Sequence, residues 1–142
     1  MLDQYKIKTR IEEIRQTVKS LERDFKHLPE EKLITDQIIY RAAERNLEIA
    51  IQCIIDISNH IISQLGLERP RKENKEIFLI LAKEKIIPME FAKKIMTMVG
   101  YRNILVHEYL NVERHYTYVN IQENLRDFGK FAKYIEEFLQ RK

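Results

Sequence analysis

One short stretch of the sequence gathers side chains that can handle a phosphate group. Residues 101–109 place Arg102, Asn103, His107 and Tyr109 around three aliphatic residues. Arginine is a permanent cation that grips two phosphate oxygens, and histidine exchanges a proton near neutral pH. An RNA 2′-hydroxyl is its own nucleophile, so one histidine and one arginine suffice to cut a strand without a metal ion. The stretch therefore suits phosphoryl transfer on RNA. The alternative is a bundle surface on which the arginine pairs with a neighbouring glutamate and the tyrosine packs.

The spacing of these side chains limits how they can share one site. On a regular helix Arg102 and His107 lie roughly 140° apart, whereas Asn103 and His107 share a face. Arg102 and Tyr109, seven residues apart, nearly share another face. Two arrangements bring the arginine and the histidine to one phosphate: a bend in the helix, or a second copy of the chain. We favour the second copy, because two-fold dimers are the commonest oligomers, and we expect a homodimer with a composite cleft.

Other kinds of site lack the spacing that they require. The sequence contains no C-x-x-C, no H-E-x-x-H and no Glu-x-x-His of the di-iron type, so we expect no metal. Gly66, Gly100 and Gly129 are isolated, which excludes the glycine-rich loops that cradle nucleotides. We therefore expect no cofactor.

The remaining reactive residue types receive structural interpretations. Cys53 lies in an isoleucine-rich segment and is predicted to be a buried, small apolar residue. His27 and His60 lie on predicted helices without a polar constellation around them, and His115 neighbours Arg114 and Tyr116 in a polar stretch. For each of the three the sequence favours a structural or solvated role.

Composition bounds the molecule and its location. The 142 residues suit a single domain over positions 1–142, and the formal net charge of +3 is too small for a protein that coats nucleic acid by charge alone. One cysteine cannot form a disulfide within its own chain, which favours a reducing compartment. The sequence has no apolar run long enough for a signal peptide or a membrane span. We expect a cytoplasmic protein without membrane association.

Two long helices are predicted in the first half of the chain. Apolar residues over 7–28 follow alternating spacings of four and three, as one face of a helix requires. A second helix is expected over 38–65, capped by Thr35 or Asp36 and ended by Gly66. Its apolar residues cover more than one stripe, which predicts a place at the centre of a bundle.

The second half of the chain is predicted to complete the bundle. A short helix is expected over 75–85, and a fourth helix starts at Pro88 and carries the phosphate-handling stretch. A closing helix follows Asn111, with apolar residues at alternating spacings of four and three. The sequence therefore predicts an all-α fold, an antiparallel bundle of four to five helices.

The residues around the motif resemble the HEPN superfamily. Its ribonuclease members carry an arginine, a polar residue directly after it and a histidine a few positions on, which here are Arg102, Asn103 and His107. The extended form Arg-x4-His-x-Tyr, ending at Tyr109, resembles the HepT-like toxins. Further similarity, which extends the resemblance to about residues 1–140, lies in segments 44–47, 56–61 and 98–103.

This resemblance implies a function, partners and roles for the site residues. It implies a five-helix homodimer that acts as a metal-independent endoribonuclease, the toxin of a toxin–antitoxin pair. His107 would then be general base or acid, Arg102 the phosphate clamp, and Asn103 would orient the phosphate or His107. The implied partner is an MntA-type nucleotidyltransferase antitoxin, which transfers AMP to the motif tyrosine, Tyr109. Such a group beside His107 would add negative charge where RNA phosphate must lie.

Two questions stay open at this point. The rival function is a non-catalytic helical dimer that serves as binding partner or substrate of a nucleotidyltransferase. On the central helix, Arg41 is interpreted as part of a solvated helix pair. Either a supporting role for the cleft or a solvated pair is possible for Glu44, Arg45, Asp56 and Asn59.

Overall fold

The chain folds into helices joined by short connections. The structure, a computed structural model, describes residues 2–67, 76–107 and 111–141, without the side chains at 99, 101–107 and 111–113. No strand occurs among the described residues, which confirms the predicted all-α class. The helices are α1 (Gln4–Asp24), α2 (Glu30–Thr35), α3 (Gln37–Gln64), α4 (Ile77–Lys83), α5 (Met89–His107), α6 (Asn111–Glu123) and α7 (Leu125–Leu139).

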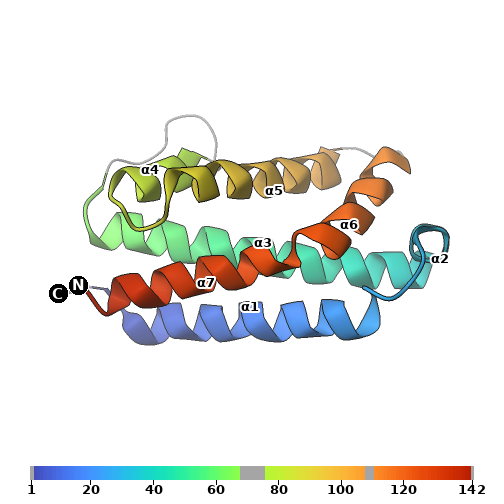
Figure 1. Cartoon of the computed structure of the whole chain (residues 1–142), viewed down its shortest axis with the longest axis horizontal. Coiled ribbons are helices and arrows are strands. Elements are labelled where there is room, and N and C mark those ends of the chain that lie inside the picture. Colours follow the sequence, from blue (N-terminus) through green and yellow to red (C-terminus); the bar gives the residue numbers. More distant parts are fainter. Residues whose placement is uncertain (1, 68–75, 108–110, 142) are drawn as a thin grey trace.

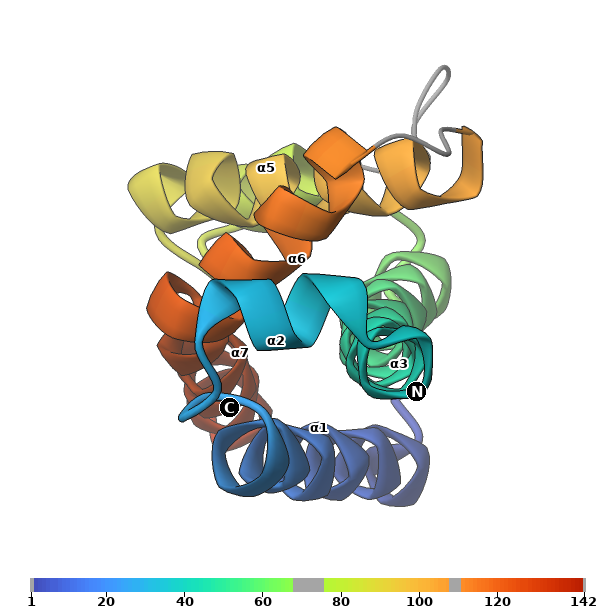
Figure 2. The same cartoon turned by 90° about the vertical axis from the view of Figure 1, so that its right-hand side faces the viewer.

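Helix α3 is the centre of the bundle, as its apolar pattern predicts. It contacts each of the other six helices of the described chain. Helices α1 and α7 lie along one side of α3, and α4 and α5 lie along the other (Figure 1). The short helix α2 and the oblique helix α6 close one end of the bundle (Figure 2).

Both ends of α3 follow from single residues. The side chain of Asp36 accepts the backbone N–H groups of Ile38 and Ile39 at 3.0 and 3.1 Å, so Asp36 is the cap. At the other end Gly66 adopts a φ of 67°, which L side chains rarely adopt, and the Leu67 N–H bonds back to the Ile62 carbonyl at 2.9 Å. The predicted end at Gly66 is confirmed.

The chain between α1 and α3 differs from the prediction. Helix α1 ends at Asp24 rather than near residue 28, because the Phe25 and Lys26 N–H groups both bond to the Leu21 carbonyl and turn the chain. Helix α2 then starts directly after Pro29, whose fixed φ suits the start of a helix. Only Leu33 of α2 is buried, so the sequence has no apolar period to announce this six-residue helix.

The predicted closing helix is divided into α6 and α7. The division falls at Asn124, whose side-chain amide donates to Oδ1 of Asn120 at 2.7 Å. Asparagine side chains compete with the backbone for hydrogen bonds and favour helix ends. As a result α6 crosses the end of the bundle at an angle to α7 (Figure 1).

Candidate functional site

The phosphate-handling residues lie at the end of α5. Arg102, Asn103 and His107 belong to its last two turns, and their side chains are among those that the structure does not describe. Tyr109 lies outside the described residues. Helix α5 runs unbroken from Met89 to His107, so Gly100 does not end or interrupt it.

The first half of α5 is fixed against α7. The rings of Phe91 and Tyr134 meet edge to face with centroids 5.0 Å apart. Lys94 places its ammonium nitrogen 3.2 Å from Oδ2 of Asp127, a carboxylate that is fully buried. A buried carboxylate requires a counter-charge, so this ion pair resists separation of the two helices. The turns of α5 that carry the motif therefore continue from a half of the helix that is fixed against α7.

The helix that follows the candidate site is fixed by Arg114. Its guanidinium donates to the Ile34 carbonyl at 2.7 Å and to the Gln37 side chain at 2.8 Å. It also lies over the Tyr40 ring, 4.3 Å from the centroid. One side chain of α6 thus joins α2, the cap region of α3 and the first turn of α3.

Tyr40 is the buried partner in this contact. Its ring is 1% exposed, and its hydroxyl lies 3.1 Å from Oγ1 of Thr117 on α6. Burial raises the pKa of the Tyr40 phenol to about 12, so the hydroxyl stays protonated at neutral pH. Nearby His115 pairs with Glu30, which adds a link between α6 and α2.

The contacts of Arg114 and Tyr40 escape sequence reasoning. The sequence shows Arg114 and His115 only as part of a polar stretch. Tyr40 and Thr117 are 77 positions apart, so no local pattern reports their contact. The sequence gives one hint of this contact, which is a tyrosine near the start of the long helix predicted over 38–65.

The residues left open on the central helix divide into two groups. Arg41 pairs with Glu44 at 3.0 Å and Arg45 with Glu48 at 3.5 Å, each at i,i+3 on α3. Such pairs contribute a few tenths of a kcal/mol, which agrees with the interpretation of Arg41. Asp56 and Asn59 instead line a hollow between α1 and α3, at the end of α3 remote from its cap.

The structure also describes the surroundings of Cys53, His27 and His60. Cys53 is 2% exposed and its thiol donates to Oε1 of Glu13 at 3.1 Å. Burial, followed by the Glu13 carboxylate, raises the pKa of this thiol to about 12. His27 is exposed, and His60 accepts a hydrogen bond from the Asp3 N–H.

The described parts of the chain hold neither a cluster of metal ligands nor a membrane-spanning helix. Among those residues no three His, Cys, Asp or Glu side chains gather as metal ligands would. None of the helices described is both long and apolar enough to pass through a membrane.

Comparisons with known proteins identify the family and the fold. A family model described as Ribonuclease HepT-like matches residues 7–135. The chain is 34% identical over 96 residues to "tRNA nuclease HepT" of Aphanizomenon flos-aquae, covering 68% of this chain and 65% of that protein. It is 33% identical over 91 residues to "mRNA nuclease HepT" of Shewanella oneidensis, covering 64% of this chain and 68% of that protein. The alignments thus span about two thirds of each relative.

Among solved structures, the fold matches that of a toxin bound to its antitoxin. The tri-AMPylated Shewanella oneidensis HEPN toxin in complex with MNT antitoxin superposes with a TM-score of 0.83 and 27% identity. The match covers 96% of this chain and 99% of that one. A toxin–antitoxin complex with AMP-PNP gives the same TM-score at 26% identity, covering 93% of this chain and 98% of that one.

Proposed function

The chain belongs to the HepT-like ribonuclease family, and from that membership we propose that it is a toxin that cuts RNA internally without a metal ion. One observation carries the proposal: the family match spans the helix that ends in Arg102, Asn103 and His107. Two similar proteins are named as a tRNA nuclease and an mRNA nuclease, and both names describe RNA cleavage, the activity proposed here. We also propose that residues 1–142 act as one domain in the cytoplasm.

Each motif residue has a distinct task in the proposed reaction. His107 removes the proton from the RNA 2′-hydroxyl, or donates one to the leaving 5′-oxygen. The 2′-oxygen attacks the neighbouring phosphorus and the bond to the 5′-oxygen breaks, which leaves a 2′,3′-cyclic phosphate. Arg102 neutralises the charge that builds on the phosphate oxygens, and Asn103 orients the phosphate or His107.

The proposed active form is a homodimer. Residues five apart on a regular helix, as Arg102 and His107 are, lie roughly 140° apart around its axis. A two-fold partner lets the arginine of one copy and the histidine of the other meet at one phosphate, so the composite cleft needs both. Light scattering or sedimentation of the purified protein measures this state directly.

We further propose that a nucleotidyltransferase antitoxin controls the enzyme through Tyr109. A similar HEPN toxin is AMPylated and bound to its MNT antitoxin in the solved structure. Transfer of AMP to the Tyr109 hydroxyl, with release of pyrophosphate from ATP, would place a bulky anion two residues from His107. Intact mass before and after incubation with ATP and a purified MntA-type nucleotidyltransferase tests that step, and Tyr109→Phe should gain no mass.

The central experiment compares cleavage by matched histidine variants. The wild-type protein should cut total tRNA or an mRNA transcript equally well with and without a chelator. His107→Ala should lose at least a hundredfold in rate, because general acid–base catalysis contributes about that much or more. His27→Ala is the control, since His27 is exposed and lies between α1 and α2, outside the helix that carries the motif.

The nature of the products decides the mechanism. Fragments that end in 2′,3′-cyclic phosphate support attack by the RNA's own hydroxyl. Fragments that end in 3′-hydroxyl, or activity that a chelator removes, would contradict it. Wild-type protein that cuts no RNA but still binds or accepts AMP from the nucleotidyltransferase would instead favour the non-catalytic helical module.

A further inference from the structure

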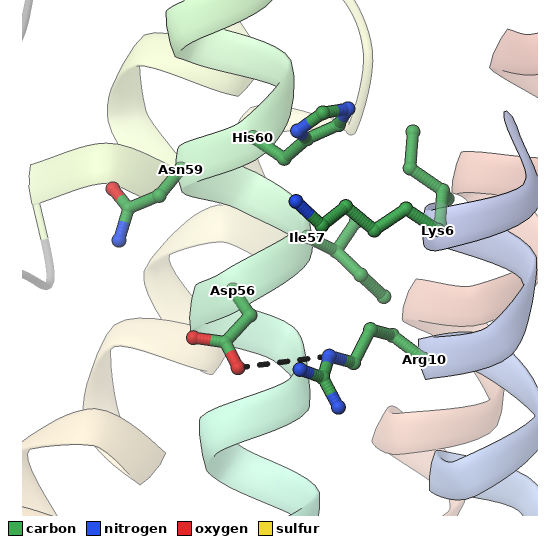
Figure 3. A pocket seen from close by; sticks show the side chains of 7 residues that line it. Lys6, Arg10, Asp56, Ile57, Asn59 and His60 are labelled. Carbon is green, nitrogen blue, oxygen red and sulfur yellow. Dashed lines mark ion pairs between the residues drawn. The ribbon is translucent and has the colours of Figure 1, made fainter. Parts of the chain in front are cut away.

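A hollow of about 300 Å³ lies between the first turns of α1 and the last third of α3. It lies at the opposite end of α3 from the turns of α5 that carry the motif (Figure 1). Its floor is apolar, formed by Ile7 and Ile57, each 1% exposed. Its walls carry Lys6 and Arg10 from α1, and Asp56 and His60 from α3 (Figure 3).

Two cations on the α1 wall keep their hydrogen-bond donors free. In the described part of the chain Lys6 has no ion pair and no side-chain hydrogen bond, although its ammonium group reaches across toward α3 (Figure 3). The Arg10 guanidinium nitrogens lie 3.8 Å from Oδ2 of Asp56 and 3.9 Å from Oε1 of Glu13, so both carboxylates stabilise its positive charge. Both distances exceed hydrogen-bond length, so the guanidinium N–H groups remain available.

His60 supplies a third donor from the α3 wall. Its Nε2 accepts the backbone N–H of Asp3 at 3.2 Å. A ring nitrogen that accepts carries no proton, so in this contact the ring proton lies on Nδ1. The Asp3 contact therefore fixes both the orientation of the ring and its tautomer, and leaves the Nδ1–H free to donate.

The carboxylates near the hollow are already engaged. Asp56 accepts the Gln52 side-chain amide at 2.8 Å through Oδ1 and faces Arg10 through Oδ2. Glu13 accepts the Cys53 thiol and also faces Arg10. The Lys6 charge is left without a counter-charge in the structure. Because Ile7 and Ile57 exclude water from the floor, the attraction of an anion to these donors is stronger than it is in bulk water.

We propose that this hollow binds a phosphate group. Phosphate is a pure acceptor with several oxygens in a tetrahedral arrangement, so it can take separate hydrogen bonds from Lys6, Arg10 and His60. Two sources supply that chemistry: a free phosphate ion, or a backbone phosphate of a bound RNA strand. The site lies outside the proposed cutting residues and needs no catalysis, so it stands or falls apart from the proposed ribonuclease activity.

The test of the site titrates inorganic phosphate into the isotope-labelled full chain at pH 7, with chloride used to hold ionic strength constant. NMR resonances of the His60 ring and the Asp3 amide should shift to saturation. Lys6→Gln with Arg10→Gln should weaken binding by about tenfold or more, since a hydrogen bond to a charged group contributes about that factor. Lys133→Gln, which removes an exposed charge from α7, is the matched control and should leave binding unchanged.

Three results would overturn the proposal. They are shifts that rise linearly without saturating, shifts that chloride alone reproduces, and equal affinity in the wild type and the double variant. Circular dichroism melts of the variants show that lost binding is not lost folding. The exposure of Lys6 and the half-exposure of Arg10 make both substitutions compatible with the fold.

A second arm identifies the source of the phosphate. A 2′-O-methyl oligoribonucleotide cannot be cut, because the attacking hydroxyl is blocked, so its binding is read without turnover. If a strand phosphate enters the hollow, the negative slope of log affinity against log salt should become shallower by about 0.7 in the double variant, relative to Lys133→Gln. If the two variants give equal slopes while inorganic phosphate saturates the hollow, the ligand is a free phosphate.

Discussion

Burial and a neighbouring carboxylate act together on the Cys53 thiol. The side chain is 2% exposed, and its hydrogen bond to Glu13 stabilises the protonated form. Both causes raise the pKa of the thiol to about 12. At pH 8 the thiolate therefore makes up roughly one part in ten thousand, and the thiolate is the reactive form.

We expect Cys53 to resist thiol reagents in the folded protein. Iodoacetamide or Ellman's reagent at pH 8 should leave the native chain unmodified over an hour and should modify it fully in guanidinium chloride. Intact mass spectrometry counts the adducts. Complete modification of the native chain within minutes would contradict both the burial and the raised pKa.

The Arg15–Glu136 ion pair predicts how stability responds to acid. Arg15 donates to both carboxylate oxygens at 2.9 and 2.6 Å, and this hydrogen bonding holds the Glu136 pKa below its ordinary value of 4.5. A lowered pKa in the folded state contributes stability above pH 4.5, and that contribution is lost as pH falls through the lowered value. Both side chains are about 40% exposed, so the contribution is at most about 1 kcal/mol.

Glu136→Gln should therefore be less stable than the wild type at pH 7, and the difference should shrink as the pH falls below 4.5 toward 3. Urea unfolding at both pH values gives the difference in free energy of unfolding. The control is Glu137→Gln, because Glu137 is exposed and has no side-chain partner in the described structure. A Glu136→Gln effect that persists unchanged at pH 3 would show that the pair is not its cause.

At the scale of single residues, the sequence predicts the family of the chain, but it does not predict which side chains touch one another. Residue types alone singled out Arg102, Asn103 and His107, and the family match confirms the family to which that motif pointed. The grip of Arg114 on Tyr40 depends on helices that are far apart in the chain. No spacing rule reports such a contact, because it is formed only when the bundle closes.

At the scale of helices, the sequence predicts some of the helix ends correctly and others wrongly. Asp36 and Gly66 are strong signals and both act as predicted. The end of α1 and the division at Asn124 were missed because neither carries a glycine or a proline at the break. Helix α2 was missed because six residues are too few to show a period.

Two glycines give opposite predictions because their backbones differ. Gly66→Ala should lower the free energy of unfolding by about 1 kcal/mol, since an alanine is strained at a φ of 67°. Gly129→Ala should raise it by about 0.5–1 kcal/mol, because Gly129 lies inside α7 and an added Cβ meets nothing within 4 Å. Thermal or urea unfolding measures both variants, and equal signs for the two would contradict the account.

In the whole molecule, the two chain ends and the candidate site lie at opposite ends of the bundle. Helix α5 starts near the end of the bundle where both termini lie and runs toward the other end (Figure 1). At the C-terminus, Arg141 donates to the Lys85 carbonyl at 2.8 Å in the turn before α5. The nineteen residues of α5 extend about 28 Å, so its last turns lie far from that anchor.

A folded partner fused after the C-terminus should therefore leave RNA cleavage unchanged. We expect kcat/KM of the fusion to stay within about twofold of the unfused protein, because the added domain lies at the remote end of the bundle. Cleavage of the same transcript by both proteins measures the ratio. A hundredfold loss with an intact helical spectrum would place the working cleft near the termini instead.

The shielded thiol of Cys53 also makes the chain a ready host for spin labels. The sequence has one cysteine, so a second one introduced by Lys133→Cys on the exposed face of α7 would be the only thiol to take a nitroxide. Pulsed electron resonance would then report one distance between the labels of two paired copies. No cysteine-free background has to be engineered first.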